Sequence, residues 1–370
     1  MPNTPPGPDP ALPPVRVNLY SDTQTRPSPA MKRAMTQAET GDEQHGDDPT
    51  ILALCDRMAA LLGKEAAVFL PTGTMCNQIA LLTHCRPGEE VIAHGSAHIV
   101  MAEGGGPGAL ARVSVRGLRG ARGQFDADSL RGAIRERRRN SPPQTLVEVE
   151  QTANWGGGSI WPLDRLNAVL DLAHEEGMAT HMDGARLMNA VVASGVPARE
   201  MVAGCDSVWL DFTKGLGAPL GAVLCGSAAF IDAAWRWKQR LGGALRQGGI
   251  CAAACLYALD HNIDRLAEDH TNASALARGL AQIPGIAVEE PETNLVFFDV
   301  RGTGLTAEAL EARVRAEGVM ISTMGHTRAR ACTHLDVDQA GIETALAAIR
   351  RAVARTEPAL PREARHTMPQ

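Results

Sequence analysis

The chain has 370 residues, a formal net charge of −6 and a hydrophobic content of 44%, so it is long enough for a large core and its composition is that of a globular protein. The densest basic run, 135–139 (RERRR), is expected to form the exposed end of a helix, and no apolar stretch is long enough to span a bilayer, which disfavours nucleic-acid and membrane partners. The eight cysteines are scattered without zinc-ligand spacing and no secretory signal is recognisable, so we expect a cytoplasmic protein with reduced thiols and no bound metal.

The chain begins with a Pro-rich stretch, 1–14, that we expect to be a disordered tail. From there to about residue 265, apolar runs alternate with amphipathic segments. We expect strands at 66–70, 145–149, 178–183, 207–212 and 221–225, and helices at about 75–85 and 162–176. This alternation predicts an α/β fold with a mostly parallel sheet in a large domain, 15–265.

The sequence changes character after about residue 265. A strand-like run at 294–300 is followed by helical patterns at 306–317 and 339–354, which predicts a smaller α+β domain over 266–355. The segment 15–50 precedes the first predicted strand and can pack with either domain, and 356–370 reads as a second disordered tail.

A possible anion site lies where the strand 66–70 leads into the next helix. The turn between them contains Thr72, Gly73 and Thr74, and the free N–H groups and dipole of a helix N-terminus favour a phosphate. The turn lacks the lysine of a Walker loop, and no GxGxxG fingerprint follows a strand, so this signal is generic.

A carboxylate and an arginine follow the predicted strand 178–183. Asp183 ends the strand, and a Gly-Ala turn leads to Arg186. The carboxyl ends of parallel strands face the ligand crevice of such sheets. Asp183 can cap a helix there, or it can pair with the protonated ring nitrogen of a pyridine cofactor.

Lys214 is one of only four lysines among the 36 basic residues and stands between two apolar runs. An amine can lose its proton and attack a carbonyl, which a guanidinium cannot. Glycines 215, 217 and 221 would allow a bulky group to approach, although a lysine at a strand end can also simply extend its amine to solvent. A phosphate turn, a strand-end aspartate and a later lysine are together the parts of a pyridoxal phosphate site.

With these three features and the stretches given next, the chain resembles the threonine aldolase branch of the fold-type-I pyridoxal-phosphate enzymes, the β-eliminating lyase family. The similar stretches are Ser21-Asp22-Thr23 with Arg26-Pro27, Gly46-Asp47-Asp48-Pro49-Thr50, Pro71-Thr72-Gly73-Thr74, Ala97-His98, Glu150 to Gly158, His181 to Ala190, Lys214-Gly215-Leu216-Gly217, Gly242-Gly243 with Arg246-Gln247, and Thr333-His334-Leu335-Asp336. They span residues 16 to 355 in order.

The resemblance implies a role for each matching residue. Lys214 resembles the Schiff-base lysine, Asp183 the ring-nitrogen partner, His98 the imidazole on the cofactor ring and candidate base, and Gly73 and Thr74 the phosphate cradle. For binding of the substrate carboxylate, the resemblance implies Ser21, Arg186 and Arg330, and it counts Arg186 among the cofactor contacts as well. Arg330 is preferred to Arg328 because its spacing to Thr333 matches the family. Arg246 resembles a phosphate contact lent by a neighbouring subunit, which implies a homodimer or homotetramer.

Two departures from the family pattern bear on the substrate. Many members have an arginine where this chain has Tyr20, and a histidine where it has Ala153, beside Trp155. We therefore expect retro-aldol cleavage of a β-hydroxy-α-amino acid such as L-threonine or L-allo-threonine, to glycine and an aldehyde. Phenylserine or 3-hydroxyaspartate as substrate stays open, as does β-elimination or racemisation. A cofactor-free aldolase on a (β/α)₈ barrel and a non-catalytic pyridoxal-binding protein are the readings from other classes.

Overall fold

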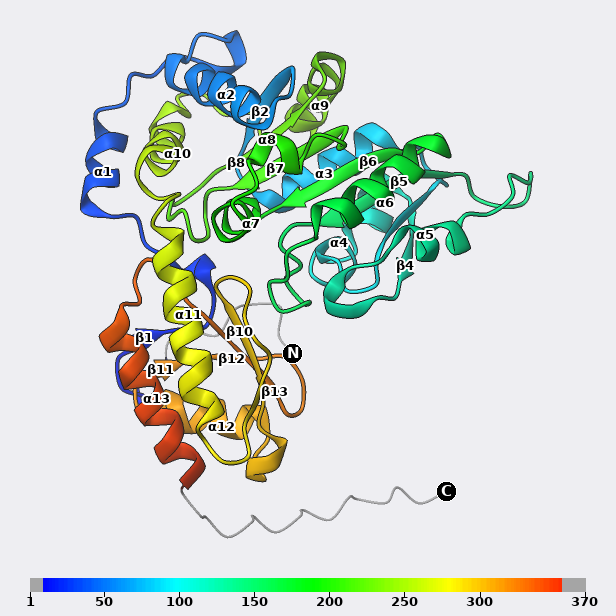
Figure 1. Ribbon diagram of the computed structural model, residues 1–370. Coiled ribbons are helices and arrows are strands. Elements are labelled where there is room, and N and C mark those ends of the chain that lie inside the picture. The colour runs from blue at the N-terminus through cyan, green and yellow to red at the C-terminus, as the bar shows by residue number, and fades with distance from the viewer. Residues whose placement is uncertain (1–8, 355–370) are drawn as a thin grey trace, which may run out of the picture.

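The computed structural model describes residues 9–354, which fold into two lobes, one built on a seven-stranded sheet and the other on a four-stranded and a two-stranded sheet (Figure 1). The predicted tail at 356–370 lies outside the described residues, and so does the tail at 1–14 except for residues 9–14. Among the described residues, no helix has both the length and the apolar character needed to cross a membrane.

The larger lobe is built on a seven-stranded sheet in the order β2-β8-β7-β6-β5-β3-β4. Its strands are β2 (Ala66–Leu70), β3 (Glu90–His94), β4 (Ser114–Leu118), β5 (Gln144–Glu150), β6 (Ala179–Gly184), β7 (Ser207–Asp211) and β8 (Ala222–Gly226). Within this sheet β8 runs antiparallel to both its neighbours, and the other pairs are parallel. The inner strands β7 and β8 are buried along their whole length, which explains why they read as unbroken apolar runs.

Helices cover both faces of this sheet (Figure 1). They are α1 (Pro29–Thr36), α2 (Pro49–Leu62), α3 (Gly73–His84), α4 (His98–Met101), α5 (Ala127–Ala133), α6 (Leu163–Glu175), α7 (Leu187–Ser194), α8 (Ala198–Met201), α9 (Ala228–Arg240) and α10 (Gly249–His261). In α6 the residues at helical spacing, Leu166, Val169, Leu170 and Ala173, are all buried, because they form the stripe that packs on the sheet.

The basic run 135–139 does not end a helix, so that prediction was wrong. The helix α5 ends at Ala133, and Ile134 is already extended. Arg135 then turns back to the sheet and forms an ion pair with Glu90 of β3, which a continued helix would not allow. The loop projects from the larger lobe between α5 and β5 (Figure 1).

The smaller lobe contains a four-stranded antiparallel sheet in the order β12-β13-β10-β9. Its elements are β9 (Ala287–Val288), β10 (Leu295–Asp299), β12 (Ser322–Thr323), β13 (Arg328–Cys332), α11 (Leu266–Ala281), α12 (Ala307–Arg315) and α13 (Gln339–Ala354). The N-terminal segment contributes to both lobes. Its strand β1 (Val17–Asn18) pairs with β11 (Val319–Met320) of the smaller lobe, whereas α1 packs on α10 of the larger lobe.

Candidate active site

A cavity of about 590 Å³ lies where the two lobes meet the N-terminal segment. The carboxyl ends of β5, β6 and β7 supply Glu150, Asp183 and Asp211 to its wall, as expected for a parallel sheet. Of the predicted site residues, the structure brings eight together in this wall: Ser21, Gly73, Thr74, His98, Asp183, Arg186, Lys214 and Arg330.

The N-terminus of α3 opens into the cavity at one end. Thr72 caps the helix by accepting a hydrogen bond from the Met75 N–H (3.2 Å), while Gly73 and Thr74 form the first turn. Among the described residues, no side chain accepts from the N–H groups of Gly73 and Thr74, so these donors are available to an anion. A Cβ at position 73 would come within 2.2 Å of the Trp209 indole, so the turn requires glycine.

Asp183, the penultimate residue of β6, is a carboxylate that is only 1% exposed. One oxygen accepts from Asn77 Nδ2 (2.8 Å) and the other from the Ala185 N–H (3.0 Å). Burial raises the pKa of Asp183, although the charges of His98 and Lys214 and the hydrogen bonds act against the shift. A buried, hydrogen-bonded carboxylate of this kind suits a cationic partner in the cavity.

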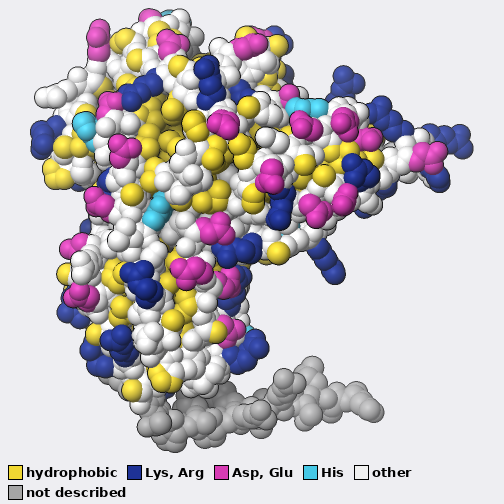
Figure 2. Space-filling model, in the orientation of Figure 1, with side chains coloured by type: hydrophobic (Ala, Val, Ile, Leu, Met, Phe, Trp, Pro, Cys, Tyr) yellow, Lys and Arg dark blue, Asp and Glu magenta, His cyan; other side chains and the backbone are white. Residues whose placement is uncertain are grey.

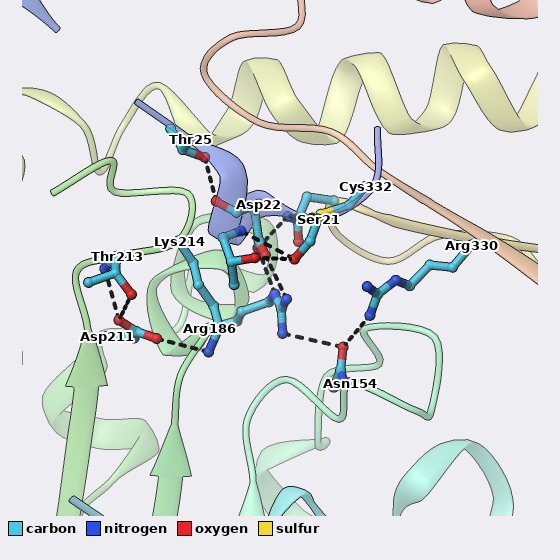
Figure 3. Close-up of polar contacts among 12 residues, drawn as sticks. Ser21, Asp22, Thr25, Asn154, Arg186, Asp211, Thr213, Lys214, Arg330 and Cys332 are labelled. Carbon is cyan, nitrogen blue, oxygen red and sulfur yellow. Dashed lines mark hydrogen bonds and ion pairs between the residues drawn. The ribbon is translucent and has the colours of Figure 1, made fainter. Parts of the chain in front are cut away.

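Lys214 reaches the cavity from the loop after β7. Its Nζ lies 2.9 Å from Asp211 Oδ2 and 5.7 Å from the centroid of the Trp209 ring. Asp211 is itself held by the N–H and hydroxyl of Thr213 (2.8 and 2.7 Å). The amine is therefore fixed by an ion pair with the last residue of the strand that precedes its loop, as Figure 3 shows.

His98 begins the short helix α4 and faces the cavity with one ring nitrogen engaged elsewhere. Its Nδ1–H donates to Glu103 Oε1 (2.8 Å), a carboxylate with no exposed side-chain surface. Burial alone would lower the pKa of His98, but the Glu103 hydrogen bond and the charge of Asp183 outweigh it, so the pKa is raised. Nε2 is left as the nitrogen able to exchange a proton.

Glu150 lines the cavity beside His98. Its two oxygens accept from the backbone N–H groups of Asn154 (2.8 Å) and His98 (3.2 Å). Burial and the nearby Asp183 raise the pKa of Glu150 to about 7. Glu150 thus fixes the backbone that carries the imidazole.

The two arginines of the cavity differ in their partners (Figure 3). Arg186 donates from Nε and Nη2 to the two oxygens of Asp22, both at 2.7 Å, so its charge is neutralised. Although burial would raise the pKa of Asp22, the Arg186 charge holds it well below its usual range. Arg330 donates to neutral oxygens, namely Asn154 Oδ1 (3.1 Å), the Tyr20 carbonyl (3.2 Å) and Ser322 Oγ (3.2 Å). Within the described chain no carboxylate lies within ion-pair distance of Arg330.

Two other predicted contacts sit differently. Ser21 lines the cavity, and its Oγ accepts from the N–H and hydroxyl of Thr23 (3.2 and 2.9 Å). Arg246 lies outside the cavity of its own chain, with a side chain that is 59% exposed and paired with Asp42 at 2.9 Å. A phosphate contact from Arg246 requires a second subunit and stays a prediction.

The departure at Ala153 does not alter the cavity wall directly. Ala153 is 2% exposed and lies under Gly123, whose Cβ, if it had one, would meet the Ala153 methyl at 2.8 Å. The residue that faces the cavity from this segment is its neighbour Asn154. The effect of the missing histidine on the substrate range stays a prediction. Tyr20, the other departure, is 40% exposed and gives Arg330 its backbone carbonyl.

Sequence reasoning assigned no role to several residues that shape the site, although some of them lie in the matching stretches. These are Asp22, Asn77, Glu103, Glu150, Asn154, Trp209 and Asp211. Asn77 had a usable signal, since it follows Gly73 by four residues and so lies on the same face of α3. Asp22 belonged to the Ser21-Asp22-Thr23 match, but its role had no signal, because only the fold brings it to Arg186, 164 residues away.

Comparison with known proteins agrees with this geometry. A sequence profile described as "Beta-eliminating lyase" matches residues 18–303. The chain belongs to the β-eliminating lyase family. The resemblance drawn from the motifs is thereby confirmed.

Relatives within the β-eliminating lyase family match almost from end to end. The low specificity L-threonine aldolase of Escherichia coli K12 is 41% identical over 324 residues, 87% of this chain and 95% of the relative. The low-specificity L-threonine aldolase 1 of Arabidopsis thaliana is 38% identical over 344 residues, 91% and 96% of the two chains.

Solved structures confirm the fold of this family member. The threonine aldolase of Leishmania major superposes with a TM-score of 0.79 at 21% identity, covering 91% of this chain and all of that one. The serine palmitoyltransferase of Sphingomonas wittichii gives 0.72 at 17% identity over 90% and 86% of the two chains. The architecture is therefore fold type I of the pyridoxal-phosphate enzymes, as the sequence predicted, and the barrel alternative is wrong.

Proposed function

We propose that the protein is a pyridoxal-phosphate-dependent lyase that cleaves a β-hydroxy-α-amino acid, such as L-threonine or L-allo-threonine, to glycine and an aldehyde. The observation that carries this proposal is the meeting of Lys214, Asp183 and the open N-terminus of α3 in one cavity. The names and near-complete coverage of the E. coli and A. thaliana relatives support the same reaction.

The residues present fit pyridoxal phosphate. The unfilled N–H groups at Gly73 and Thr74 suit its phosphate, and the buried carboxylate of Asp183 suits a protonated ring nitrogen. The Lys214 amine suits its aldehyde carbon, and His98 would lie against its ring. When bound, this cofactor supplies an acceptor for the electrons of a bond broken at the substrate Cα.

Arg330 is the group we assign to the amino-acid carboxylate, because it is buried, charged and bonded only to neutral oxygens. Holding the carboxylate fixes rotation about the Cα–N bond and so selects which Cα bond is broken. Arg186 would then act mainly through its third nitrogen, Nη1, which faces Asn154 at 3.4 Å.

His98 Nε2 would take the proton of the substrate β-hydroxyl as the Cα–Cβ bond breaks and the aldehyde leaves. The Glu103 hydrogen bond at Nδ1 fixes the imidazole with Nε2 toward the cavity and stabilises its protonated form. The same His98 or Glu150 could return a proton to Cα to complete glycine, since both line the cavity.

We further propose a cytoplasmic homodimer or homotetramer in which Arg246 of one subunit approaches the cofactor phosphate of another. Figure 2 shows a broad area of hydrophobic side chains across the larger lobe, between charged side chains of both signs. An exposed apolar area of this kind is typical of a subunit interface. The oligomeric state can be measured by light scattering, with and without the cofactor.

The test is aldehyde release by the purified protein with added pyridoxal phosphate. L-Threonine, L-allo-threonine, phenylserine and 3-hydroxyaspartate are supplied side by side, and glycine is measured against aldehyde. Equal amounts of both products from any of the four establish the reaction. If the protein binds the cofactor but releases aldehyde from none of the four, the proposed retro-aldol reaction is refuted, and elimination or racemisation should be tested instead. Lys214→Ala should lose both turnover and covalent attachment of the cofactor, measured by mass spectrometry after borohydride treatment.

A further inference from the structure

A buried asparagine on α3, Asn77, bridges two carboxylates of the site. Its side-chain Nδ2 donates one hydrogen to Asp183 Oδ2 (2.8 Å) and one to Glu103 Oε1 (2.7 Å). Its Oδ1 accepts from Trp209 Nε1 (2.7 Å) and faces His181 Nε2 at 3.2 Å. Asn77 is 0% exposed, so the full capacity of its amide is used by these four partners.

The amide of Asn77 can adopt only one of its two orientations. If it were flipped, the carbonyl oxygen would face two carboxylates and the NH₂ group would face the Trp209 N–H, which can only donate. Acceptors that face acceptors and donors that face donors are strongly unfavourable in a buried place. The orientation of the amide is therefore set by its partners.

A chain of hydrogen bonds behind Asn77 reinforces this orientation. His181 must carry its proton on Nε2 to donate to Asn77, so its Nδ1 accepts from the Ser207 hydroxyl (2.8 Å). The Ser207 oxygen in turn accepts from His84 Nε2 (2.7 Å), whose ring is stacked on Phe230. Burial lowers the pKa of His181 to about 3 and that of His84 to about 4, so both rings are neutral donors.

We propose that Asn77 is a positioning residue, which holds Asp183 toward the cofactor's ring nitrogen and Glu103 toward His98, and that His181, Ser207 and His84 fix the orientation of its amide. This inference rests on the proposed function, since it assigns Asp183 to the cofactor. The reason for an amide here is that it alone offers two donors on one side and an acceptor on the other. A carboxylate or an apolar side chain of the same size would remove the donor to Asp183 Oδ2 and one of the donors to Glu103 Oε1, leaving Asp183 held only by the Ala185 N–H.

The first test uses histidine nitrogen NMR on the protein freed of cofactor, so it is independent of catalysis. His181 is assigned by comparison with His181→Gln. A proton on Nε2 and a lone pair on Nδ1, from pH 6 to pH 8, are expected. A proton on Nδ1 in the neutral ring would overturn the proposed orientation of Asn77.

The second test measures the dissociation constant of pyridoxal phosphate alone for wild type, Asn77→Leu and Asn77→Asp. Asn77→Leu removes one charge-assisted hydrogen bond from Asp183, so the constant should rise by about tenfold or more. Asn77→Asp keeps the shape but adds a carboxylate beside Asp183, Glu103 and His181. It should bind weakly at pH 8 and recover toward wild type at pH 6, because a protonated carboxyl can again donate to one neighbour.

A matched control is Asn272→Leu, which removes another asparagine side chain that donates, to the Val337 carbonyl (3.1 Å), in the smaller lobe. It should leave cofactor affinity unchanged. If Asn77→Asp binds as tightly as wild type, or is weakened equally at both pH values, the positioning role is wrong. If wild type itself does not bind pyridoxal phosphate, the proposed function fails instead, and the NMR result still decides the orientation of the amide.

Discussion

Replacement of Arg330 by leucine should remove substrate binding while leaving the fold intact. A guanidinium has five N–H groups, and three of those on Arg330 are used by Ser322, Asn154 and the Tyr20 carbonyl, which leaves two. Two charge-assisted hydrogen bonds to a carboxylate are worth about 1.5–3 kcal/mol each, or about 3–6 kcal/mol together. The KM for L-threonine should therefore rise by about 100-fold or more.

Stability provides a second readout for Arg330→Leu. Burial without a carboxylate partner lowers the pKa of Arg330 and makes its charge unfavourable in the empty site. The free energy of unfolding should consequently stay the same or increase, and cofactor affinity should not change. Glycine formation at varied L-threonine, together with urea denaturation, measures both quantities.

Arg328 offers the matched control. It lies two residues earlier on β13 and pairs with Glu289 outside the cavity, at 2.9 and 3.0 Å. Arg328→Leu should leave KM unchanged. A KM for Arg330→Leu within about threefold of wild type would correspond to less than about 1 kcal/mol, and would refute the assignment of the carboxylate to this side chain.

Three further predictions follow from the same geometry. Ala153→His should destabilise the protein by roughly 1–3 kcal/mol because it enlarges a side chain at a buried position that packs close to Gly123; an unchanged denaturation midpoint would contradict this. Glu103→Gln removes a partner that raises the pKa of His98, so the acid limb of the kcat/KM profile for aldehyde release should move to lower pH; a limb that stays in place would mean that another group is the base. Glu148 is fully buried with both oxygens unpaired, and burial raises its pKa well above the usual range. Glu148 stays protonated in the folded chain at pH values where it would ionise in the unfolded chain. The free energy of unfolding therefore falls as the pH rises above about 4.3. Glu148→Gln should gain stability relative to wild type between pH 5 and pH 7, by up to about 1.4 kcal/mol per pH unit in urea denaturation; an equal difference at both pH values would refute a protonated Glu148.

Much of the fold could be predicted because the relevant patterns are local. The run 66–70 coincides with β2 and the pattern at 339–354 with α13. Both could be predicted because burial leaves a short apolar run in a strand and a repeat of apolar residues every three to four positions in a helix. The direction of β8 could not be predicted, because a fully buried strand is apolar whichever way it runs. The helix predicted to end at 135–139 was wrong because Arg135 pairs with Glu90, which is distant in sequence, and no local pattern indicates such a contact.

The candidate site was predictable where chemistry follows a strand end. Asp183 and Lys214 stand at such positions, and the sheet alone brings them into one cavity. That Asn154 rather than Ala153 faces the cavity could not be predicted, because position in a motif does not say which of two neighbours faces inward. The difference between Arg186 and Arg330 was equally hidden, because it depends on where Asp22 lies in space.

Asp22 explains how the site keeps one arginine available. Two unpaired cations in one buried cavity would repel each other and raise the energy of the empty site. Asp22 neutralises Arg186, which follows β6 in the larger lobe, and also accepts from Asn294 Nδ2 (3.1 Å), which precedes β10 in the smaller lobe. Asp22 of the N-terminal segment therefore does two things: it links the two lobes at the cavity, and it neutralises one of the two arginines there. Since Arg330 reaches the cavity from β13, the free cation exists in the right place only when both lobes and this segment are packed together. Substrate recognition is thus coupled to the assembled chain rather than to the larger lobe alone.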